Sequence, residues 1–331
     1  MRKDHSVLSE PGISIFVREV REPTTETRDP PILLLHGARV PGVASFDLPV
    51  PGGSLAADLA QAGHVVYIMD ARGYGQSTRP PEMSEPRGDN APLVRSSEVV
   101  RDVAGVVEWI RGRGAERVAL LGWATGGHWL GYYATLYPEQ VSHLILDNTL
   151  YGATKGHPVI GPGSNLEDPD APGQFNASEY GAYRFSTAES LFGSWDRSIP
   201  LEDKSAWRDP AVASAYAAAA LASDETSEDR APPSFRAPTG ALEDSFYLAS
   251  GRQLWDASLI RSPTLIISSE RDFWARPGDR TSLKEHLVHA PRVRVVILPD
   301  ATHFVHLDRP ERGRDRFIRE VLAFIGDSPG H

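Results

Sequence analysis

The chain has 331 residues, no cysteine and a formal net charge of −10 at pH 7. This length suits one large α/β domain with an insertion, and the negative charge excludes the basic surface that nucleic-acid binding requires. The lack of cysteine excludes disulfides, a thiolate nucleophile and a thiolate metal site. The sequence shows no signal peptide and no apolar run that could span a membrane. We therefore expect a cytoplasmic protein with a small-molecule substrate and no membrane partner, and we leave a homo-oligomer open.

Strand and helix patterns alternate through the first part of the chain. Alternation of apolar and polar residues predicts an early antiparallel strand at 13–20, and continuous apolar runs predict buried strands at 32–35 and 65–69. Apolar residues at helical spacing predict helices at 55–62 and 97–112. The order of these elements is typical of a sheet covered by helices.

A sharp turn at 122–127 separates a strand from a helix. The short apolar run at 118–121 predicts a buried strand, and 128–137 predicts a mostly apolar helix that stops before Pro138. The next buried strand is expected at 141–146.

The alternation stops near residue 150 and resumes near residue 259. In between, the sequence is rich in Gly, Pro and Asp, and it predicts helices at 186–192 and 211–223. The alternation then predicts further strands and helices at 263–268, 280–289, 293–298 and 309–325. We therefore predict an α/β fold with a mostly parallel central sheet and helices on both faces. Residues 1–149 and 259–331 would form the core, and 150–258 an inserted helical lid.

Four motifs, in this order along the chain, resemble those of the α/β-hydrolase superfamily. They are LLLHG at 33–37, DARGYGQS at 70–77, GWATG at 122–126, and the pair SERD at 269–272 and ATHFVHLDRPE at 301–311. The resemblance covers 13–149 and 259–331 and implies the α/β-hydrolase fold. Within the second motif, Asp70 and Arg72 are expected to pair with each other.

The turn at 122–126 resembles the nucleophile elbow of this superfamily, but its central residue is Ala124. The superfamily ordinarily has Ser there, and a methyl group cannot attack a carbonyl carbon. Two interpretations follow: Ser was replaced by Ala in this chain, or the chain is a natural homologue that does not use this position for chemistry.

The resemblance implies that Asp272 is the acid and His303 the base of a catalytic triad, in the superfamily's order. His303 would take the proton of the missing Ser, and Asp272 would hold the imidazole tautomer. Asp147 is an alternative acid and His306 an alternative base. Thr302, just before His303, departs from the superfamily's usual Gly.

Backbone N–H groups of Ala38 and Thr125 are implied as the oxyanion hole, with His36 packed beneath the loop that carries Ala38. Arg39 follows Ala38 and could bind a substrate carboxylate or carbonyl, or pair with Asp47 or an acid of the lid. Trp123 could wall the pocket or pack under the turn. No metal ion and no cofactor is expected.

The predicted lid carries many aromatic residues, some of which would line an apolar pocket. They are Tyr180, Tyr183, Phe185, Phe192, Trp195, Trp207, Phe246, Tyr247 and Trp255. We therefore predict a hydrolase of the carboxylic ester or lactone of a bulky, largely apolar small molecule, here in a form inactivated by Ser→Ala.

The sequence is also compatible with other functions. The same groups could cleave an amide, a thioester or a carbon–carbon bond next to a carbonyl. The chain could also be a natural ligand-binding homologue, or a cofactor-independent lyase or oxygenase that uses His303 as its base. A dehalogenase or an epoxide hydrolase would need Asp at position 124.

Overall fold

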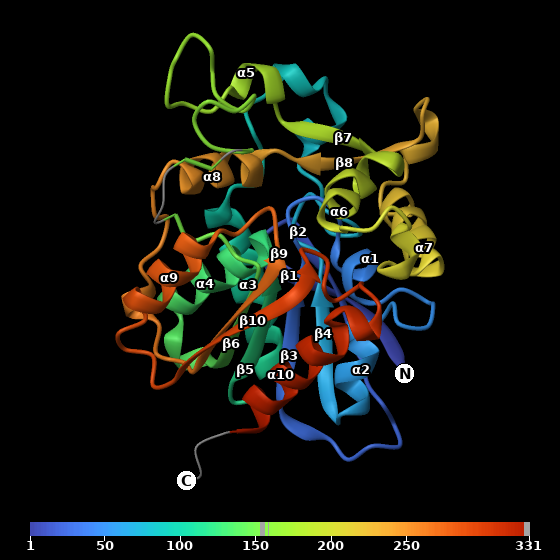
Figure 1. Ribbon diagram of the computed structural model, residues 1–331, viewed down its shortest axis with the longest axis vertical. Helices are drawn as coiled ribbons and strands as arrows, with labels where there is room; N and C mark the ends of the chain where they lie inside the picture. Colours follow the sequence, from blue (N-terminus) through green and yellow to red (C-terminus); the bar gives the residue numbers. More distant parts are fainter. Residues whose placement is uncertain (153–155, 158, 328–331) are drawn as a thin grey trace.

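The centre of the computed structural model is an eight-stranded sheet (Figure 1), and the structure describes residues 1–152, 156–157 and 159–327. The strand order is β1-β2-β4-β3-β5-β6-β9-β10. The pairs β1–β2 and β2–β4 are antiparallel, and the other pairs are parallel. The strands are β1 (Arg2–Glu10), β2 (Ile13–Val20), β3 (Arg28–Leu35), β4 (His64–Met69), β5 (Val118–Trp123), β6 (Val141–Asp147), β9 (Thr264–Arg271) and β10 (Val293–Thr302). The predicted mostly parallel sheet is confirmed, while the edge strand β1, whose side chains are mostly exposed, was not predicted.

Helices cover both faces of the sheet, which explains why the central strands are apolar without alternation. On β3, Ile32 and Leu34 belong to one buried cluster, and Leu33 and Leu35 belong to another. Residues of α2 (Leu55–Gln61) and α10 (Arg314–Gly326) join the first cluster, and residues of α3 (Ser96–Arg111), α4 (Thr125–Leu136) and α9 (Pro277–His286) join the second. Across the described part of the chain, no helix combines the length and the apolar character needed to cross a lipid bilayer.

The segment 150–258 lies between β6 and β9 and forms the upper part of the molecule with the loop before α3 (Figure 1). It contains helices and a separate two-stranded antiparallel sheet, namely α5 (Ala177–Tyr180), β7 (Tyr183–Thr187), α6 (Phe192–Ser198), α7 (Pro210–Ala222), β8 (Ser234–Pro238) and α8 (Gly240–Ala249). The helix expected at 211–223 is confirmed by α7. The helix expected at 186–192 is wrong: residues 183–187 pair with β8 as a strand, Glu189–Leu191 form a 3₁₀ turn, and α6 begins only at Phe192.

The remaining elements are short. They are α1 (Gly42–Phe46) and 3₁₀ turns at Pro81–Ser84, Arg87–Asp89, Pro138–Gln140, Glu189–Leu191, Lys204–Ala206, Ser227–Asp229, Ala257–Leu259 and Pro310–Arg312. Residues 153–155 and 158 of the predicted lid, and 328–331 of the predicted core, lie outside the described residues.

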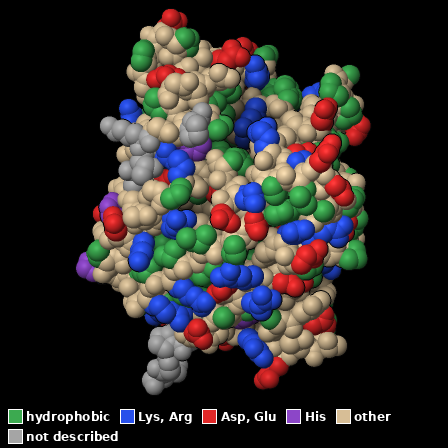
Figure 2. Space-filling model, in the orientation of Figure 1, with side chains coloured by type: hydrophobic (Ala, Val, Ile, Leu, Met, Phe, Trp, Pro, Cys, Tyr) green, Lys and Arg blue, Asp and Glu red, His purple; other side chains and the backbone are tan. Residues whose placement is uncertain are grey.

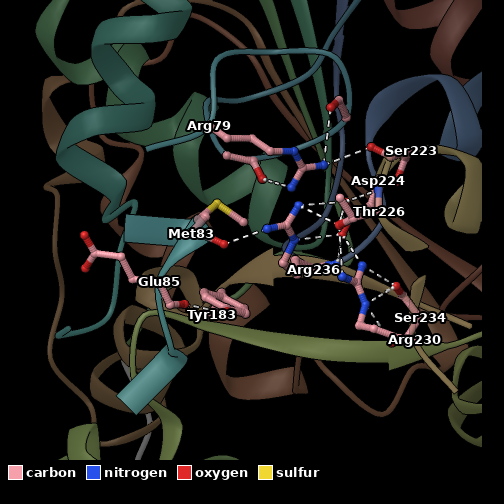
Figure 3. Close-up of polar contacts among 12 residues, drawn as sticks. Arg79, Met83, Glu85, Tyr183, Ser223, Asp224, Thr226, Arg230, Ser234 and Arg236 are labelled. Carbon is pink, nitrogen blue, oxygen red and sulfur yellow. Dashed lines mark hydrogen bonds and ion pairs between the residues drawn. The ribbon is translucent and has the colours of Figure 1, made fainter. Parts of the chain in front are cut away.

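A buried carboxylate within 150–258 holds an arginine that reaches the core: Arg236 donates to the backbone oxygen of Met83 at 2.6 Å (Figure 3). Asp224, after α7, accepts hydrogen bonds from the backbone and guanidinium of Arg236 and from Arg230. Arg79, from the core, donates to the backbone oxygen of Ser223 at 2.9 Å. Burial would raise the pKa of Asp224, but the hydrogen bonds from Arg236 and the nearby positive charges hold it below its usual value.

The expected pairing of Asp70 with Arg72 is wrong. Arg72 instead donates to Asp102 of α3 at 2.6 Å. Asp70 accepts the backbone N–H groups of Gly42 at 2.7 Å and Gln76 at 3.0 Å. Each side chain finds a partner from a distant segment, which the local sequence does not reveal.

Candidate active site

The turn between β5 and α4 holds Ala124 in a strained conformation, with φ 53° and ψ −116°. The N–H of Ala124 donates to the backbone oxygen of Asp147 at 2.8 Å, which fixes the turn against β6. A Cβ at Gly122 would lie 2.4 Å from the carbonyl carbon of Gly126, and one at Gly126 would lie 2.2 Å from the backbone oxygen of Leu35. The two glycines are therefore required by close backbone approach, and the turn presents residue 124 at the end of the strand.

Asp272 and His303 form a direct pair at the ends of β9 and β10. His303 Nδ1 lies 2.6 Å from Asp272 Oδ1, and both side chains are buried. The N–H groups of Trp274 and Ala275 donate to Oδ1 and Oδ2 of Asp272 at 2.9 and 2.8 Å, so the backbone after β9 also holds the carboxylate. Because Nδ1 donates to the carboxylate, Nε2 of the neutral ring carries the lone pair that a general base needs.

The alternative acid, Asp147, is fully buried at the end of β6. Its two carboxylate oxygens have no hydrogen-bond partner in the described part of the structure. Burial first, and then the negative charge of Asp272, raise the pKa of Asp147 well above its ordinary value. Asp147 is therefore suited to a neutral carboxylic acid rather than to the charged partner of an imidazole.

The alternative base, His306, packs against Trp123 and Phe46, with ring centroids 4.6 and 5.4 Å apart. Neither ring nitrogen has a hydrogen-bond partner among the described residues. Burial first, and then the electrostatic effects of His303 and Arg314, hold the pKa of His306 well below its ordinary value. His306 thus has the environment of a neutral core residue, and His303 is the histidine that meets Asp272.

The loop after β3 places Ala38 beside the elbow. Below it, His36 is fully buried: Nδ1 donates to the backbone oxygen of Gly37 at 2.6 Å, and Nε2 accepts the N–H of Ala71 at 3.1 Å. Burial lowers the pKa of His36 to about 4, so the ring is neutral near pH 7. Thr125 is the first residue of α4, and a helix leaves its first N–H groups without internal partners.

Aromatic rings enclose His303. Trp123 donates from Nε1 to the backbone oxygen of His303 at 2.9 Å, and the two rings are 5.2 Å apart. Phe273 packs against His303, with the two ring centroids 4.7 Å apart. The sequence analysis did not name Phe273 or Trp274, although both directly follow Asp272. Trp123 therefore both packs under the turn and contributes to the wall of the site.

The predicted site residues share one cavity of about 740 Å³. It is lined from the core by Gly37, Ala38, Arg39, Val40, Trp123, Ala124, Thr125, Phe273, Trp274, His303 and Phe304, and from 150–258 by Val159, Ile160, Gly163, Ser164, Asn165, Leu166, Tyr180, Arg184, Ser194, Arg197, Tyr216 and Leu242. Asp272 does not line the cavity and lies behind His303. The sequence analysis missed Arg184, Arg197 and Tyr216, which carry no local motif.

Arg39 faces this cavity without a carboxylate partner. Asp47, one of the expected partners, instead binds Arg2 and Ser54. Arg39 Nη1 donates to the backbone oxygen of Ser190 at 3.3 Å, and no acidic residue in the described part of the chain forms an ion pair with it. Burial lowers the pKa of Arg39.

Thr302, where the superfamily usually has Gly, holds the loop that carries His303. Its Oγ1 lies 2.7 Å from Asp308 Oδ2. The other oxygen of Asp308 accepts Trp195 Nε1 at 2.8 Å, so this carboxyl group also links the loop to α6. Burial raises the pKa of Asp308 to about 7, although the bonds from Thr302 and Trp195 oppose that shift.

Comparisons with known proteins agree with this architecture. A family model described as the alpha/beta hydrolase fold matches residues 30–310. The (lyso)-N-acylphosphatidylethanolamine lipase of Mus musculus is 34% identical over 89 residues, which are 27% of this chain and 23% of that protein. The chain spans less than a quarter of the length of the first curated relatives it matches.

Solved structures resemble the whole chain. The meta-cleavage product hydrolase of Pseudomonas fluorescens IP01, in a serine-to-alanine mutant complexed with acetates, has a TM-score of 0.61 and 18% identity, with 98% of both chains covered. The esterase of Exiguobacterium antarcticum has a TM-score of 0.60 and 15% identity, covering 98% of this chain and 100% of that one. At such identities, the likeness concerns the fold. Because the family model also matches most of its length, this chain belongs to the α/β-hydrolase fold family.

Proposed function

We propose that the cavity binds a carboxylic ester or lactone, and that the chain is a serine-type hydrolase arrested by Ala124. The observation that carries the proposal is the pairing of Asp272 with His303 beside a strained elbow that has no oxygen at its tip. In this proposal, the segment 150–258 acts as a lid over the site.

The substrate carbonyl would sit above the Cβ of Ala124, with its oxygen toward the N–H groups of Ala38 and Thr125. Two preorganised N–H donors stabilise a developing oxyanion by several kcal/mol in related sites. With Ser at position 124, His303 Nε2 would accept the hydroxyl proton as Oγ attacks, and would then protonate the leaving group. Asp272 would stabilise the imidazolium. Ala124 leaves binding intact but removes the atom that forms the acyl bond.

A second candidate function rests on the same pair. Because His303 keeps its bond to Asp272 in a chain with Ala124, His303 could act directly as a base on a bound substrate. This is the chemistry of a cofactor-independent lyase or oxygenase. A protein that only binds a ligand would not need the Asp272–His303 pair, so this pair favours a catalytic function.

Restoring the nucleophile tests the first proposal. We expect Ala124→Ser to be labelled by a fluorophosphonate probe and to hydrolyse 4-nitrophenyl esters, while the parent chain does neither. Ala124→Ser with His303→Asn is the matched control, since it keeps the hydroxyl and removes the base.

Three outcomes separate the candidates. Labelling and turnover by Ala124→Ser alone support the hydrolase. A folded Ala124→Ser variant that is inert to both the probe and a panel of esters and lactones would refute it. Activity in the parent chain that is lost in His303→Asn would favour the second candidate.

A further inference from the structure

Two arginines from different parts of the chain meet at the cavity. Arg39 follows Ala38 in the loop after β3, and Arg184 lies on β7. Arg184 Nη2 donates to the backbone oxygen of Ala38 at 3.1 Å, so its guanidinium is held at the proposed oxyanion loop. Arg184 Nε is buried and has no hydrogen-bond partner within the described residues.

Neither guanidinium is neutralised. The hydrogen bonds of these two side chains go to the backbone oxygens of Ser190 and Ala38, and no carboxylate in the described ranges forms an ion pair with either. Among the described residues that line the cavity there are three arginines, including the exposed Arg197, and no Asp or Glu. Burial lowers the pKa of Arg184 to about 10, and the positive charge of Arg39 adds to that shift.

In the described part of the chain, Arg79 also donates only to backbone oxygens, whereas two other buried arginines show the opposite pattern. Arg72 pairs with Asp102 and Arg314 with Asp58. The contrast is clearest across one small sheet: Arg184 on β7 pairs in register with Ala237 of β8, and the adjacent Arg236 is bound to Asp224 (Figure 3). The protein as a whole has an excess of acids. The cavity therefore holds two positive charges without carboxylate partners among the described residues, although the protein as a whole is negatively charged.

The surface view agrees with this contrast. Figure 2 shows acidic and basic side chains interspersed over most of the visible face, and basic side chains in a recess of its upper half. A cavity lined by arginines on an otherwise acidic protein attracts small anions toward the site.

We infer that the cavity selects an ester whose acyl group carries a carboxylate, bound between Arg39 and Arg184. A guanidinium presents a planar fork of donors that matches a carboxylate, and no carboxylate of the described residues is paired with Arg39 or Arg184. The position beside Ala38 sets the carboxylate on the side of the carbonyl oxygen. This inference rests on the proposed function only in taking the cavity as the ester-binding site.

Binding can be measured on the chain as it stands, because Ala124 cannot form an acyl bond. The probes are monobenzyl glutarate, which carries a carboxylate, and benzyl 5-methylhexanoate, in which an isopropyl group replaces that carboxylate. By isothermal titration we expect the anionic ester to bind at least about tenfold more tightly, as charged hydrogen bonds provide.

Four variants locate the effect. Arg39→Gln and Arg184→Gln should each weaken binding of monobenzyl glutarate by roughly tenfold, and should weaken binding of the neutral ester much less. Arg184→Lys, which keeps the charge but loses the fork, should fall between Arg184→Gln and the parent. Arg117→Gln is the charge-matched control: Arg117 is exposed and precedes β5, at the strand end opposite the site. Should Arg184→Gln fail to fold, Arg39→Gln decides the test alone.

Three results would overturn the inference. They are equal affinity for the two esters, a preference that survives both Gln substitutions, and tighter binding of benzyl phosphate than of monobenzyl glutarate. None of these depends on cleavage. A folded Ala124→Ser variant that cleaves no ester would refute the proposed hydrolase but not the carboxylate-binding site. Cleavage of neutral esters, with no preference for anionic ones, would support the hydrolase and refute the carboxylate-binding site.

Discussion

The Oγ1 of Thr302 lies 2.7 Å from Oδ2 of Asp308, so the residue just before His303 is held by a fully buried carboxyl group. The bond explains how this chain accommodates Thr where relatives have Gly. It also places a group with a pKa near neutrality within the loop that carries the proposed base.

The pH dependence of stability should report on Asp308. Its pKa rises from an ordinary value of 3.8 to about 7 on folding, mainly because of burial. The folded state therefore binds the proton more tightly, and this stabilisation is complete below about pH 4 and lost as the pH rises to about 7. The Asp308→Asn variant lacks this titration. We therefore expect its free energy of unfolding, relative to that of the parent chain, to increase by about 4 kcal/mol between pH 4 and pH 8.

Urea unfolding of both proteins at several pH values measures this gain. The comparison is needed because His36 acts in the opposite direction: its pKa is lowered to about 4, so its contribution is lost as the pH falls. A constant difference between the two proteins across this range would contradict the assignment to Asp308.

The choice of acid can be tested in Ala124→Ser. Adding Asp272→Asn should lower kcat by roughly 10³ to 10⁴, because the imidazole loses its tautomer and its counter-charge. Asp147→Asn is the matched substitution, since Asp147 lies nearby and is suited to a neutral carboxyl group. We expect it to change kcat by less than about tenfold. Steady-state kinetics on a 4-nitrophenyl ester would reveal the reverse order if Asp147 were the acid.

Gly126→Ala should be severely destabilising. The added Cβ would lie 2.2 Å from the backbone oxygen of Leu35 and 2.5 Å from that of His36, and backbone atoms of a central strand cannot move aside cheaply. A loss of more than about 3 kcal/mol is expected from chemical denaturation. Gly88→Ala, which meets nothing within 4 Å, should change stability by less than about 0.5 kcal/mol. Similar effects of the two substitutions would argue against the packing of the elbow.

Asp224→Ala should loosen the segment 150–258 from the core, because Asp224 holds Arg236, which donates to the backbone oxygen of Met83 in the core at 2.6 Å. It removes the one carboxylate shared by Arg230 and Arg236 and leaves their guanidinium groups partly buried, at an expected cost of about 3–5 kcal/mol. Limited proteolysis should then cut within 150–258 before the core is digested. Glu225→Ala changes an exposed neighbour and should leave the digestion pattern of the parent intact.

Local features were predictable from the sequence. The turn at 122–127 follows from two glycines between an apolar run and a helix, because the steric constraint acts between residues close in the chain. The order of strands and helices in the core follows from hydrophobic periodicity for the same reason. Periodicity failed at β7, where a short strand is stabilised by pairing with the distant β8.

Only the tertiary structure decided which side chains meet. From the sequence, Asp147 and Asp272 were both candidate acids, and His303 and His306 both candidate bases; the fold pairs His303 with Asp272 and buries the other two among groups that do not bind them. The sequence likewise did not predict that Arg39 and Arg184 both line the cavity. The sequence determined the fold class and the elbow, because these depend on local patterns. The fold decided the charge of the cavity and the identity of the pair, because these depend on contacts between residues far apart in the chain.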